Sequence, residues 1–446
     1  MKTVIIGNGI SGITCARWLR KLGDSEITVI SSETDYFYSR TALMYSYMGH
    51  MRPEDLKPYE DWFWKKNRID LLRAHVDSID FDSKTLNTTT GAVKYDKLVL
   101  ALGSTPNKFG WPGQDLKRVG GLYHWQDLEA MEAGSPGLKR AAIVGGGLIG
   151  IEMAEMFRSR DIDVTLVVRE GSYWSNVLPA EESAMINRHI KDHHIDLRLG
   201  VNLGSIEDDG TGAVKSIIIK ETQEEIPCGY VGLTAGVSPN IKFLKETGLE
   251  IGRGIKVNDN LETNMPDVYA VGDCAELSEP KPGRRGVEAI WYTGRMMGET
   301  AAYNIMGKNV SYDPGIWFNS AKFLDLEYQV YGKVPSKLTE DLATLYWEHA
   351  DGMKAIRINY HIADNTVAGF NLMGVRYRHE VCEKWLAERT PMAEVLTNLS
   401  LANFDPEFCA EHEQDVINLY NKKNGTQLKK EQPRSLDRVL NFLSRR

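Results

Sequence analysis

The stretch that decides the fold is KTVII at residues 2–6, which runs directly into GNGISG at residues 7–12. The first segment is mostly apolar and β-branched, as in a buried strand, and the residues after the motif favour a helix. Gly7 permits a tight turn, Gly9 lets the backbone approach a pyrophosphate, and Gly12 allows the helix to pack closely on the strand. The N-terminus of such a helix attracts anionic phosphates. We therefore predict a dinucleotide-binding unit at the start of the chain.

The residues after this motif complete the pattern. Ile10 and Ser11 lie where the phosphate-binding turn becomes helix, so we expect both to contact the nucleotide. A second strand is predicted at residues 27–30, and Glu33 follows about 20 residues after the glycines, where an acid bonds the ribose hydroxyls. Ser31 occupies the position directly after the strand, where an acid is commonest. Glu33 is therefore the predicted ribose ligand.

A second glycine fingerprint follows the same rules. AAIV at residues 141–144 leads into GGGLIGIE at residues 145–152, and residues 164–168 form the next predicted strand. The alternative is that both motifs are only tight turns in an ordinary α/β sheet. Both glycine spacings and both flanking patterns would then have arisen by chance. The expected contacts to this second nucleotide are Gly145, Gly147, Ile149 and Gly150.

The charge after this second strand bears on the choice of nucleotide. Arg169 stands directly after Val168, where an arginine suits the extra phosphate of NADPH. Glu170 beside it could instead serve the ribose diol of NADH, or Arg169 could be a surface residue paired with Glu170. The sequence favours NADPH and leaves NADH open.

Length and composition limit the class of protein. A chain of 446 residues exceeds the roughly 250–300 residues of a single growing core, so we expect three domains. No apolar run reaches the roughly 18 residues of a membrane span, and the N-terminus lacks a secretory pattern, so we expect a cytoplasmic protein that does not enter a membrane. A net charge of −8 argues against binding to nucleic acid.

The cysteines do not form a framework. None of the five belongs to a closely spaced pair, which argues against disulfides, a zinc site or an iron–sulfur cluster, and we predict no metal site. Reduced, mostly buried thiols are expected instead. The five are Cys15, Cys228, Cys274, Cys382 and Cys409.

Three further segments end in small or acidic residues. Residues 96–104 form an apolar strand that closes on Ala101 and Gly103, residues 234–240 contain Gly236, and residues 268–274 read VYAVGDC. Small residues at strand ends let chain segments approach a cofactor. Within the third segment, Gly272 is a point of close approach, and Asp273 is predicted to be a cap-forming carboxylate that faces a polar ligand.

Together these motifs resemble the pyridine nucleotide-disulfide oxidoreductase superfamily, and within it the branch of NADH:rubredoxin reductases and nitrite-reductase flavoproteins. Residues 38–40 and 59–64 strengthen the resemblance. It implies an α/β fold with two Rossmann-like domains of the glutathione-reductase type, one for FAD and one for NADH or NADPH, plus a C-terminal α+β domain. The implied units are residues 1–112 and 241–311 for FAD, 113–240 for NAD(P)H, and 312–446 for the C-terminal domain with a helical extension.

The resemblance also assigns roles to four side chains and backbone positions. It implies that Asp273 holds the flavin ribityl chain, that Gly272 lets backbone approach it, and that a helix starting nearby points its dipole at the cofactor. Glu152 is implied to lie near the nicotinamide and Trp291 near the flavin. The plainer alternatives are a solvent-facing glutamate and a core tryptophan.

The resemblance breaks down where relatives carry a redox cysteine. Residues 38–45 read YSRTALMY, and Thr41 stands where coenzyme A disulfide reductases and similar peroxidases keep their cysteine. A hydroxyl cannot cycle through thiolate or sulfenic acid, and the first glycine motif also lacks the histidine of those peroxidases. Direct flavin chemistry remains, with Arg40 and Tyr45 as predicted tuners of the flavin.

The C-terminal third changes character at Tyr312. Alternating, aromatic-rich strands are predicted at residues 317–323, 328–333, 343–347, 353–361 and 367–372. Helices are predicted at residues 380–388, 392–399 and 405–420. The polar tail at residues 424–446, with an apolar stretch at 439–443, is expected either to be disordered or to dock as a short helix. The resemblance implies that this domain covers the flavin and forms the interface of a homodimer.

The leading hypothesis is an NAD(P)H oxidoreductase that passes hydride to FAD and electrons to a separate acceptor, such as rubredoxin, ferredoxin or a reductase subunit. One alternative is an NAD(P)H oxidase that uses dioxygen. Another is a slow-turnover redox-sensing or interaction protein similar to the apoptosis-inducing-factor flavoproteins.

Overall fold

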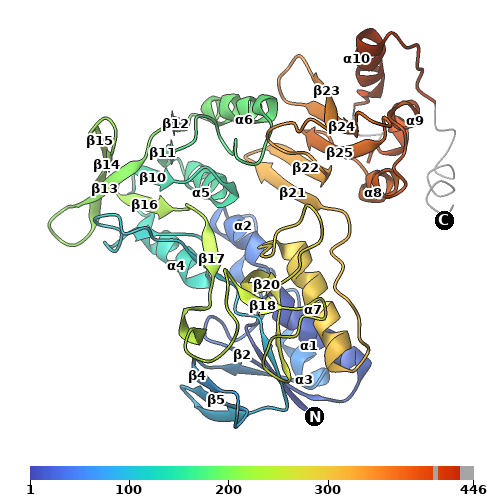
Figure 1. The fold of residues 1–446 in the computed structure, drawn as a ribbon. Coiled ribbons are helices and arrows are strands. Elements are labelled where there is room, and N and C mark those ends of the chain that lie inside the picture. Colours follow the sequence, from blue (N-terminus) through green and yellow to red (C-terminus); the bar gives the residue numbers. More distant parts are fainter. Residues whose placement is uncertain (405–409, 432–446) are drawn as a thin grey trace.

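The computed structural model describes residues 1–404 and 410–431, and it arranges them around three five-stranded sheets. In Figure 1 the elements of the first sheet occupy the lower part of the molecule, and the other two sheets lie side by side above it. The mixed α/β fold predicted from the sequence is confirmed.

The first sheet is fully parallel, with the order β19-β7-β1-β2-β3. Its central strand β1 lies between β2 and β7, so the strand order reverses at β1, and open α/β sheets bind ligands at the carboxyl end of such a switch point. The edge strand β19 comes from far along the chain, beyond the whole second sheet. The strands are β1 (Lys2–Ile6), β2 (Glu26–Ser31), β3 (Ile69–Arg73), β7 (Lys97–Leu100) and β19 (Val268–Ala270).

Two helices, α1 (Ile10–Leu22) and α7 (Trp291–Ile305), pack closely against each other beside this sheet. Their contact depends on Gly298, because a Cβ at that position would lie 2.3 Å from the carbonyl oxygen of Ser11. At Gly294 an added Cβ would lie 2.6 Å from the Ser11 hydroxyl. Glycine therefore sets the distance between α7 and the phosphate-binding end of α1.

The second sheet repeats the plan of the first, with the parallel order β12-β11-β10-β16-β9. Its strands are β10 (Arg140–Val144), β11 (Asp163–Val168), β12 (Asp196–Leu199), β16 (Tyr230–Leu233) and β9 (Val119–Gly120). Its helices are α4 (Trp125–Gly134), α5 (Leu148–Arg158) and α6 (Ala180–Asp192). The strands and helices predicted at both glycine motifs are confirmed.

Smaller sheets complete these two units. Each unit carries a three-stranded antiparallel sheet, and the chain also forms two strand pairs. The first unit has β4 (Val76–Asp80), β5 (Thr85–Thr88) and β6 (Gly91–Lys94), and the second has β13 (Leu203–Asp208), β14 (Val214–Ile219) and β15 (Glu225–Pro227). The pairs are β8 (Ser104–Pro106) with β17 (Val237–Pro239), and β18 (Ile255–Val257) with β20 (Ala275–Leu277).

The third sheet is antiparallel, as predicted, with the order β21-β22-β25-β24-β23. Its strands are β21 (Phe318–Phe323), β22 (Leu326–Gly332), β23 (Leu342–Glu348), β24 (Ala355–His361) and β25 (Val367–Met373), followed by α8 (His379–Ala387), α9 (Met392–Thr397) and α10 (Glu413–Asn424). The third helix, predicted over residues 405–420, is α10 and spans Glu413–Asn424. Residues 410–412 are not helical. Residues 405–409 and residues 432–446, which make up most of the predicted tail, lie outside the described residues.

The C-terminal sheet packs against helices of the second unit. Phe323 and Tyr328 share a hydrophobic core with Met153 and Ile186, on α5 and α6. Coverage of the flavin by this domain stays a prediction; among the described residues, the lining of the cavity described below ends at Trp291. One face of the C-terminal sheet packs on the second unit, and the other face packs on α8, α9 and α10.

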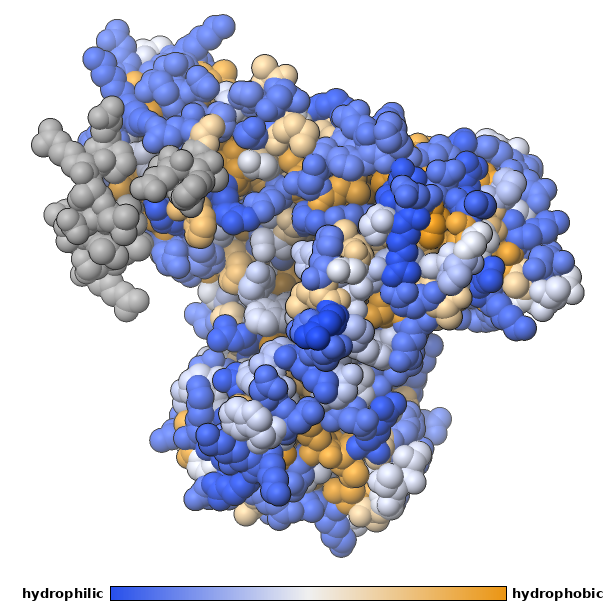
Figure 2. Space-filling view, turned by 180° about the vertical axis from the view of Figure 1, so that it is seen from behind, coloured by the Kyte–Doolittle hydropathy of each residue, from blue (hydrophilic) through white to orange (hydrophobic). Residues whose placement is uncertain are grey.

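The surface mixes the two kinds of side chain. Figure 2 shows hydrophilic residues over much of one face, with hydrophobic patches between them. Within the described part of the chain, no helix is both long and apolar enough to span a membrane.

Candidate active site

A cavity of about 440 Å³ opens at the carboxyl ends of the first parallel sheet. Its wall combines the first glycine motif, the end of β7, the turn after β19 and the first turns of α5 from the second unit. The structure thus brings two nucleotide-binding patterns to one space. The predicted site residues that line it are Gly7, Gly9, Ile10, Ser11, Glu33, Arg40, Ala101, Gly103, Ile149, Glu152, Asp273 and Trp291.

The first glycine turn has the shape of a phosphate cradle. Gly7 has φ of 113°, a left-handed value that favours glycine, and a Cβ there would lie 2.0 Å from the Ala101 carbonyl oxygen. A Cβ at Gly12 would lie 2.1 Å from the Gly7 carbonyl oxygen. Gly9 has no atom within 4 Å of its missing Cβ, so space is open beside the backbone there. The turn fits a pyrophosphate at the N-terminus of α1.

The second glycine turn repeats this geometry outside the cavity wall. A Cβ at Gly145 would lie 2.5 Å from the Thr234 carbonyl oxygen, and one at Gly150 would lie 2.4 Å from the Gly145 carbonyl oxygen. The space beside Gly147 is open within 4 Å. None of these three glycines lines the cavity, which the second unit reaches through the start of α5. A second nucleotide bound on this turn would therefore extend toward the same cavity.

Glu33 and Arg40 form a bidentate pair in the cavity wall. Arg40 Nη1 donates to Glu33 Oε1 at 3.0 Å, and Nη2 donates to Oε2 at 2.7 Å. Tyr38 and the Trp125 backbone N–H also donate to Glu33 Oε1. Burial acts to raise the pKa of Glu33, but His124, Arg40 and Tyr38 outweigh it and hold the pKa well below its ordinary value. Both carboxylate oxygens are therefore already engaged by protein groups.

Asp273 is a second, partly buried acid in the cavity wall. Ser104 Oγ donates to Asp273 Oδ2 at 3.3 Å, and the Tyr123 hydroxyl donates to the same oxygen at 3.1 Å. Burial raises the pKa of Asp273, while these two bonds oppose the rise. The predicted capping role is wrong, because the short 3-10 turn η4 (Gly272–Cys274) has no side-chain cap bond. The helix that begins beside the cavity is α7, whose first residue is Trp291.

Glu152 reaches the cavity from the first turns of α5. Burial and the neighbouring Glu155 raise the pKa of Glu152 to about 7, and Lys322 opposes this. Lys322, on β21 of the C-terminal sheet, donates to Glu155 at 2.7 Å. The C-terminal sheet therefore acts on the charge of Glu152 without lining the cavity.

Trp291 is not a core residue. It is 38% exposed, lines the cavity, and meets Tyr292 edge-on with a ring-centroid distance of 5.5 Å. Phe243, which sequence reasoning missed, also lines the cavity and is 39% exposed. Two aromatic side chains of the cavity wall, Trp291 and Phe243, are thus partly exposed to solvent.

Besides Gly12 and the three glycines of the second turn, four predicted site residues do not line the cavity. Tyr45 stacks on His50 at a centroid distance of 6.2 Å, and Gly236 precedes β17. Gly272 packs on Ser11, whose hydroxyl would lie 2.3 Å from an added Cβ. Arg169 is mostly exposed, and its Nε donates to Glu170 at 2.9 Å, the surface pairing that the sequence left open.

Tyr123 and Tyr38 were missed by sequence reasoning as partners of the two partly buried acids. Tyr123 is separated from Asp273 by 150 residues, so no local pattern could reveal the contact. Tyr38 lies five residues from Glu33 and belongs to the segment 38–40, which strengthened the family resemblance. Its hydroxyl, so close in sequence to an acid, was the signal that could have predicted this hydrogen bond.

No cysteine lines the cavity among the described residues, and Thr41 does. Cys15, Cys228, Cys274 and Cys382 are free and buried, as predicted, while Cys409 lies outside the described residues. Burial raises the pKa of Cys274 to about 12, and its thiol donates to the Leu100 carbonyl oxygen at 3.3 Å. These thiols are protonated at neutral pH and unsuited to disulfide exchange.

Comparisons with known proteins agree with this arrangement. The family model for pyridine nucleotide-disulphide oxidoreductases matches residues 1–298. An NADH oxidase of Methanocaldococcus jannaschii is 28% identical over 433 residues, which cover 92% of this chain and 94% of that protein. The ferredoxin reductase subunit of 5,5'-dehydrodivanillate O-demethylase from Sphingobium sp. is 31% identical over 337 residues, covering 74% and 81%.

The fold is shared with solved structures. The ferredoxin reductase for the CYP199A2 system from Rhodopseudomonas palustris superposes with a TM-score of 0.77 at 22% identity, covering 94% of this chain and 99% of that one. The glycine cradles, the cavity between them and the family match point to one conclusion. The chain belongs to the pyridine nucleotide-disulphide oxidoreductase family, and it is an NAD(P)H-dependent FAD oxidoreductase.

Proposed function

We propose that this oxidoreductase moves electrons directly from its flavin to a separate redox protein, without a thiol relay. The observation that carries the proposal is the cavity wall, where Thr41 lies and no described cysteine does. When bound, FAD accepts hydride from NAD(P)H and releases electrons onward. Exposed Trp291 and Phe243 at the wall offer a contact surface for an acceptor such as ferredoxin or rubredoxin.

Each unit is assigned one nucleotide in this proposal. Residues 1–112 and 241–311 bind FAD, residues 113–240 bind NAD(P)H, and residues 312–446 form the C-terminal domain. The shared strand order of the two parallel sheets and the open cradles at Gly9 and Gly147 support this division.

The FAD site uses two parts of the cavity wall. The turn from Gly7 to Gly12 receives the pyrophosphate, and Asp273, held by Tyr123 and Ser104, binds the ribityl hydroxyls. Glu33 holds Arg40 in a fixed orientation with both carboxylate oxygens. The predicted contact of Glu33 with the ribose therefore requires one of these oxygens to accept from Arg40 and from a ribose hydroxyl at the same time.

The nicotinamide would lie between the flavin and the start of α5, where Ile149 and Glu152 are located. Both residues line the cavity although they belong to the second unit. Helix α5 therefore orients the hydride donor, and the half-buried carboxylate of Glu152 sets the local charge.

The preference for NADPH depends on Arg169. Its guanidinium is exposed and paired with Glu170, so it is accessible to a ribose phosphate. Replacing Arg169 with Gln should raise KM for NADPH at least about tenfold and leave KM for NADH nearly unchanged. Equal effects on both nucleotides would remove this assignment.

Stopped-flow mixing of the FAD-loaded protein with NADH or NADPH tests the proposal at its first step. Bleaching of the oxidised flavin by either nucleotide, without added acceptor, is the expected result. An absence of bleaching with both would contradict the reductase function and favour the slow-turnover alternative.

The acceptor is tested in a second step. We expect reduced protein to be reoxidised faster by ferredoxin or rubredoxin than by air-saturated buffer. The similarity to an NADH oxidase across 92% of this chain favours dioxygen as the second candidate. Oxygen consumption that matches NAD(P)H oxidation in the presence of these proteins would select the oxidase.

Homodimer formation and a cytoplasmic location belong to the same proposal. Exposed Leu338, Ile362 and Phe404 on the C-terminal part supply apolar surface for a second copy. The free thiols of the four described cysteines fit a reducing compartment. Sedimentation velocity that gives a monomer mass at micromolar concentration would contradict the dimer.

A further inference from the structure

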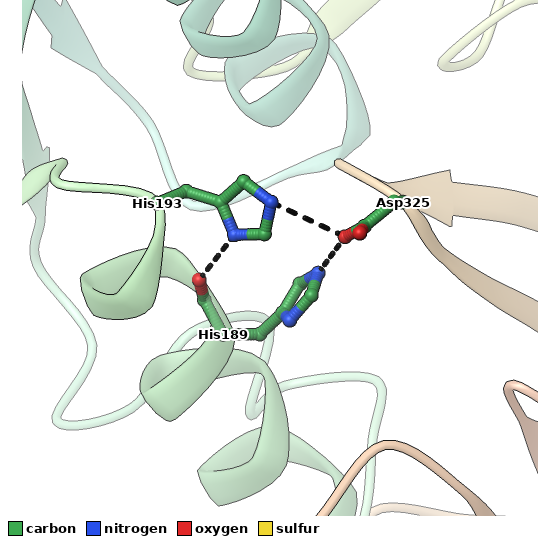
Figure 3. A group of neighbouring side chains, drawn as sticks. All are labelled: His189, His193 and Asp325. Carbon is green, nitrogen blue, oxygen red and sulfur yellow. Dashed lines mark hydrogen bonds and ion pairs between the residues drawn. The ribbon is translucent and has the colours of Figure 1, made fainter.

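Two histidines and an aspartate meet where the second unit contacts the C-terminal sheet. His189 lies in the last turn of α6, His193 is the C-cap residue directly after that helix, and Asp325 lies in the turn between β21 and β22. Figure 3 shows both rings directed at the same carboxylate. Their ligand atoms all lie within 4.8 Å of one another. None of the three residues lines the cavity of the active site.

The contacts are close but do not form a satisfied hydrogen-bond network. His189 Nε2 lies 2.5 Å from Asp325 Oδ1, and His193 Nε2 lies 3.3 Å from the same oxygen. His189 is 3% exposed, and its Nε2 faces the Asp325 carboxylate without a well-formed hydrogen bond. A buried nitrogen in this position is costly unless a proton or a cation joins it to the carboxylate.

The orientation of His193 points to a cation. Its Nδ1 lies 2.9 Å from the His189 carbonyl oxygen, so Nδ1 carries the proton and donates it. Nε2 of the same ring then faces the Asp325 carboxylate, where either a proton or a metal ion can join the two groups. A backbone carbonyl on the second ring nitrogen is also the usual support of a metal-bound histidine.

We propose that His189, His193 and Asp325 bind a first-row divalent transition metal ion such as Zn²⁺. Two histidines four residues apart on one helix face form a recurrent half of zinc sites, and a carboxylate is a common third ligand. The Asp325 side chain is 68% exposed, which gives the ion an entry path and leaves a coordination position for water.

The ion would join α6 of the second unit to the β21–β22 hairpin. This interface also carries the ion pair between Arg357 and Glu182, so the metal would reinforce an existing contact. The inference does not rest on the flavin chemistry, and its readout is metal binding rather than NAD(P)H oxidation.

The test is titration of Zn²⁺ into the tag-free, FAD-loaded, EDTA-treated protein by isothermal calorimetry. We expect one Zn²⁺ per chain, and at least tenfold weaker binding in His193→Gln and Asp325→Asn. Visible absorption of bound Co²⁺, at wavelengths longer than those of flavin, should report the same site. Thermal unfolding should shift upward with Zn²⁺ in the wild type and not in Asp325→Asn.

Two matched variants control for other histidines. His194→Asn changes an exposed neighbour whose positive φ of 59° suits asparagine, and His349→Asn changes a second histidine that contacts Asp351. Both should bind Zn²⁺ like the wild type. If the wild type binds Zn²⁺ no more tightly than Asp325→Asn, the cluster is an ion pair of protonated histidine and the proposal is overturned.

Discussion

Glu152 is a titratable cavity residue whose charge changes near neutral pH. Its pKa of about 7 means that the carboxylate forms between pH 6 and 8, beside the proposed nicotinamide. Because the nicotinamide becomes positively charged when it gives up hydride, the carboxylate should stabilise that step. Flavin reduction should therefore accelerate by about tenfold, or roughly 1.4 kcal/mol, from pH 6 to pH 8. Stopped-flow rates at saturating NAD(P)H measure the change.

Two variants separate this charge from other effects. Glu152→Gln should give a flat pH profile, whereas Glu155→Gln should keep the profile and move its midpoint to lower pH, since Glu155 raises the pKa of Glu152. A profile unchanged in Glu152→Gln would contradict the assignment.

The same shift has a consequence for stability. The folded chain keeps a proton on Glu152 that the unfolded chain releases, since the pKa is raised from 4.5 to about 7. This contribution to the free energy of unfolding is complete below pH 4.5 and is lost as pH rises through 7. Urea unfolding of the apoprotein should show a smaller decline from pH 5 to pH 8 in Glu152→Gln than in the wild type.

Asp273 should decide how firmly FAD is retained. Its carboxylate, oriented by Tyr123 and Ser104, can accept bonds from ribityl hydroxyls, and hydrogen bonds to a charged group contribute about 1.5–3 kcal/mol. Asp273→Ala should weaken FAD binding by about tenfold or more, measured as flavin-to-protein ratio after gel filtration. The exposed Asp259→Ala is the control, and a fully yellow Asp273→Ala protein would remove the assignment.

At the scale of elements, the distance between α1 and α7 depends on one glycine. Gly298→Ala would place a Cβ 2.3 Å from the Ser11 carbonyl oxygen and 3.1 Å from the Cys15 backbone nitrogen. The helices must separate, so the free energy of unfolding should fall by about 1–3 kcal/mol. FAD retention should fall with it, since Ser11 lines the cavity.

Gly171→Ala provides the matched comparison for this change. No atom lies within 4 Å of its missing Cβ, and its φ is not positive. Denaturant unfolding should leave this variant within about 0.5 kcal/mol of the wild type. A Gly298→Ala protein as stable as Gly171→Ala would show that the helices can move apart without cost.

At the scale of the whole molecule, a buried charge network joins the second unit to the C-terminal sheet. Arg357 on β24 donates to both oxygens of Glu182 on α6, at 2.6 and 2.9 Å, and Asn371 also donates to Glu182. Arg357→Met leaves an uncompensated buried carboxylate, so we expect a loss of about 3–5 kcal/mol in the free energy of unfolding.

A double variant tests whether the lost charge balance is the cause. Arg357→Met combined with Glu182→Gln leaves no buried charge and retains an amide for Asn371, so it should recover most of the loss. Urea unfolding measures both proteins. Equal destabilisation in the single and double variants would show that packing, and not charge, holds the two parts together.

Most of the fold could be predicted because it depends on local patterns. Each strand, glycine turn and helix of the two nucleotide units occupies a short stretch in which side-chain alternation, backbone freedom and helix propensity act together. The antiparallel C-terminal sheet was predictable for the same reason. The position of that sheet was not, because the helices it covers, α5 and α6, lie far away in the sequence.

The sequence by itself determined that this protein binds two dinucleotides and carries Thr41 where the resembling disulfide reductases keep a redox cysteine, since glycine spacing and the identity of one residue need no distant partner. Only the tertiary structure decided that Tyr123 orients Asp273, that Arg40 occupies Glu33, and that histidines at the end of α6 meet Asp325. The physical reason is that hydrogen bonds, burial and charge act through space. The sequence spacing of these groups carries no record of the distances between them.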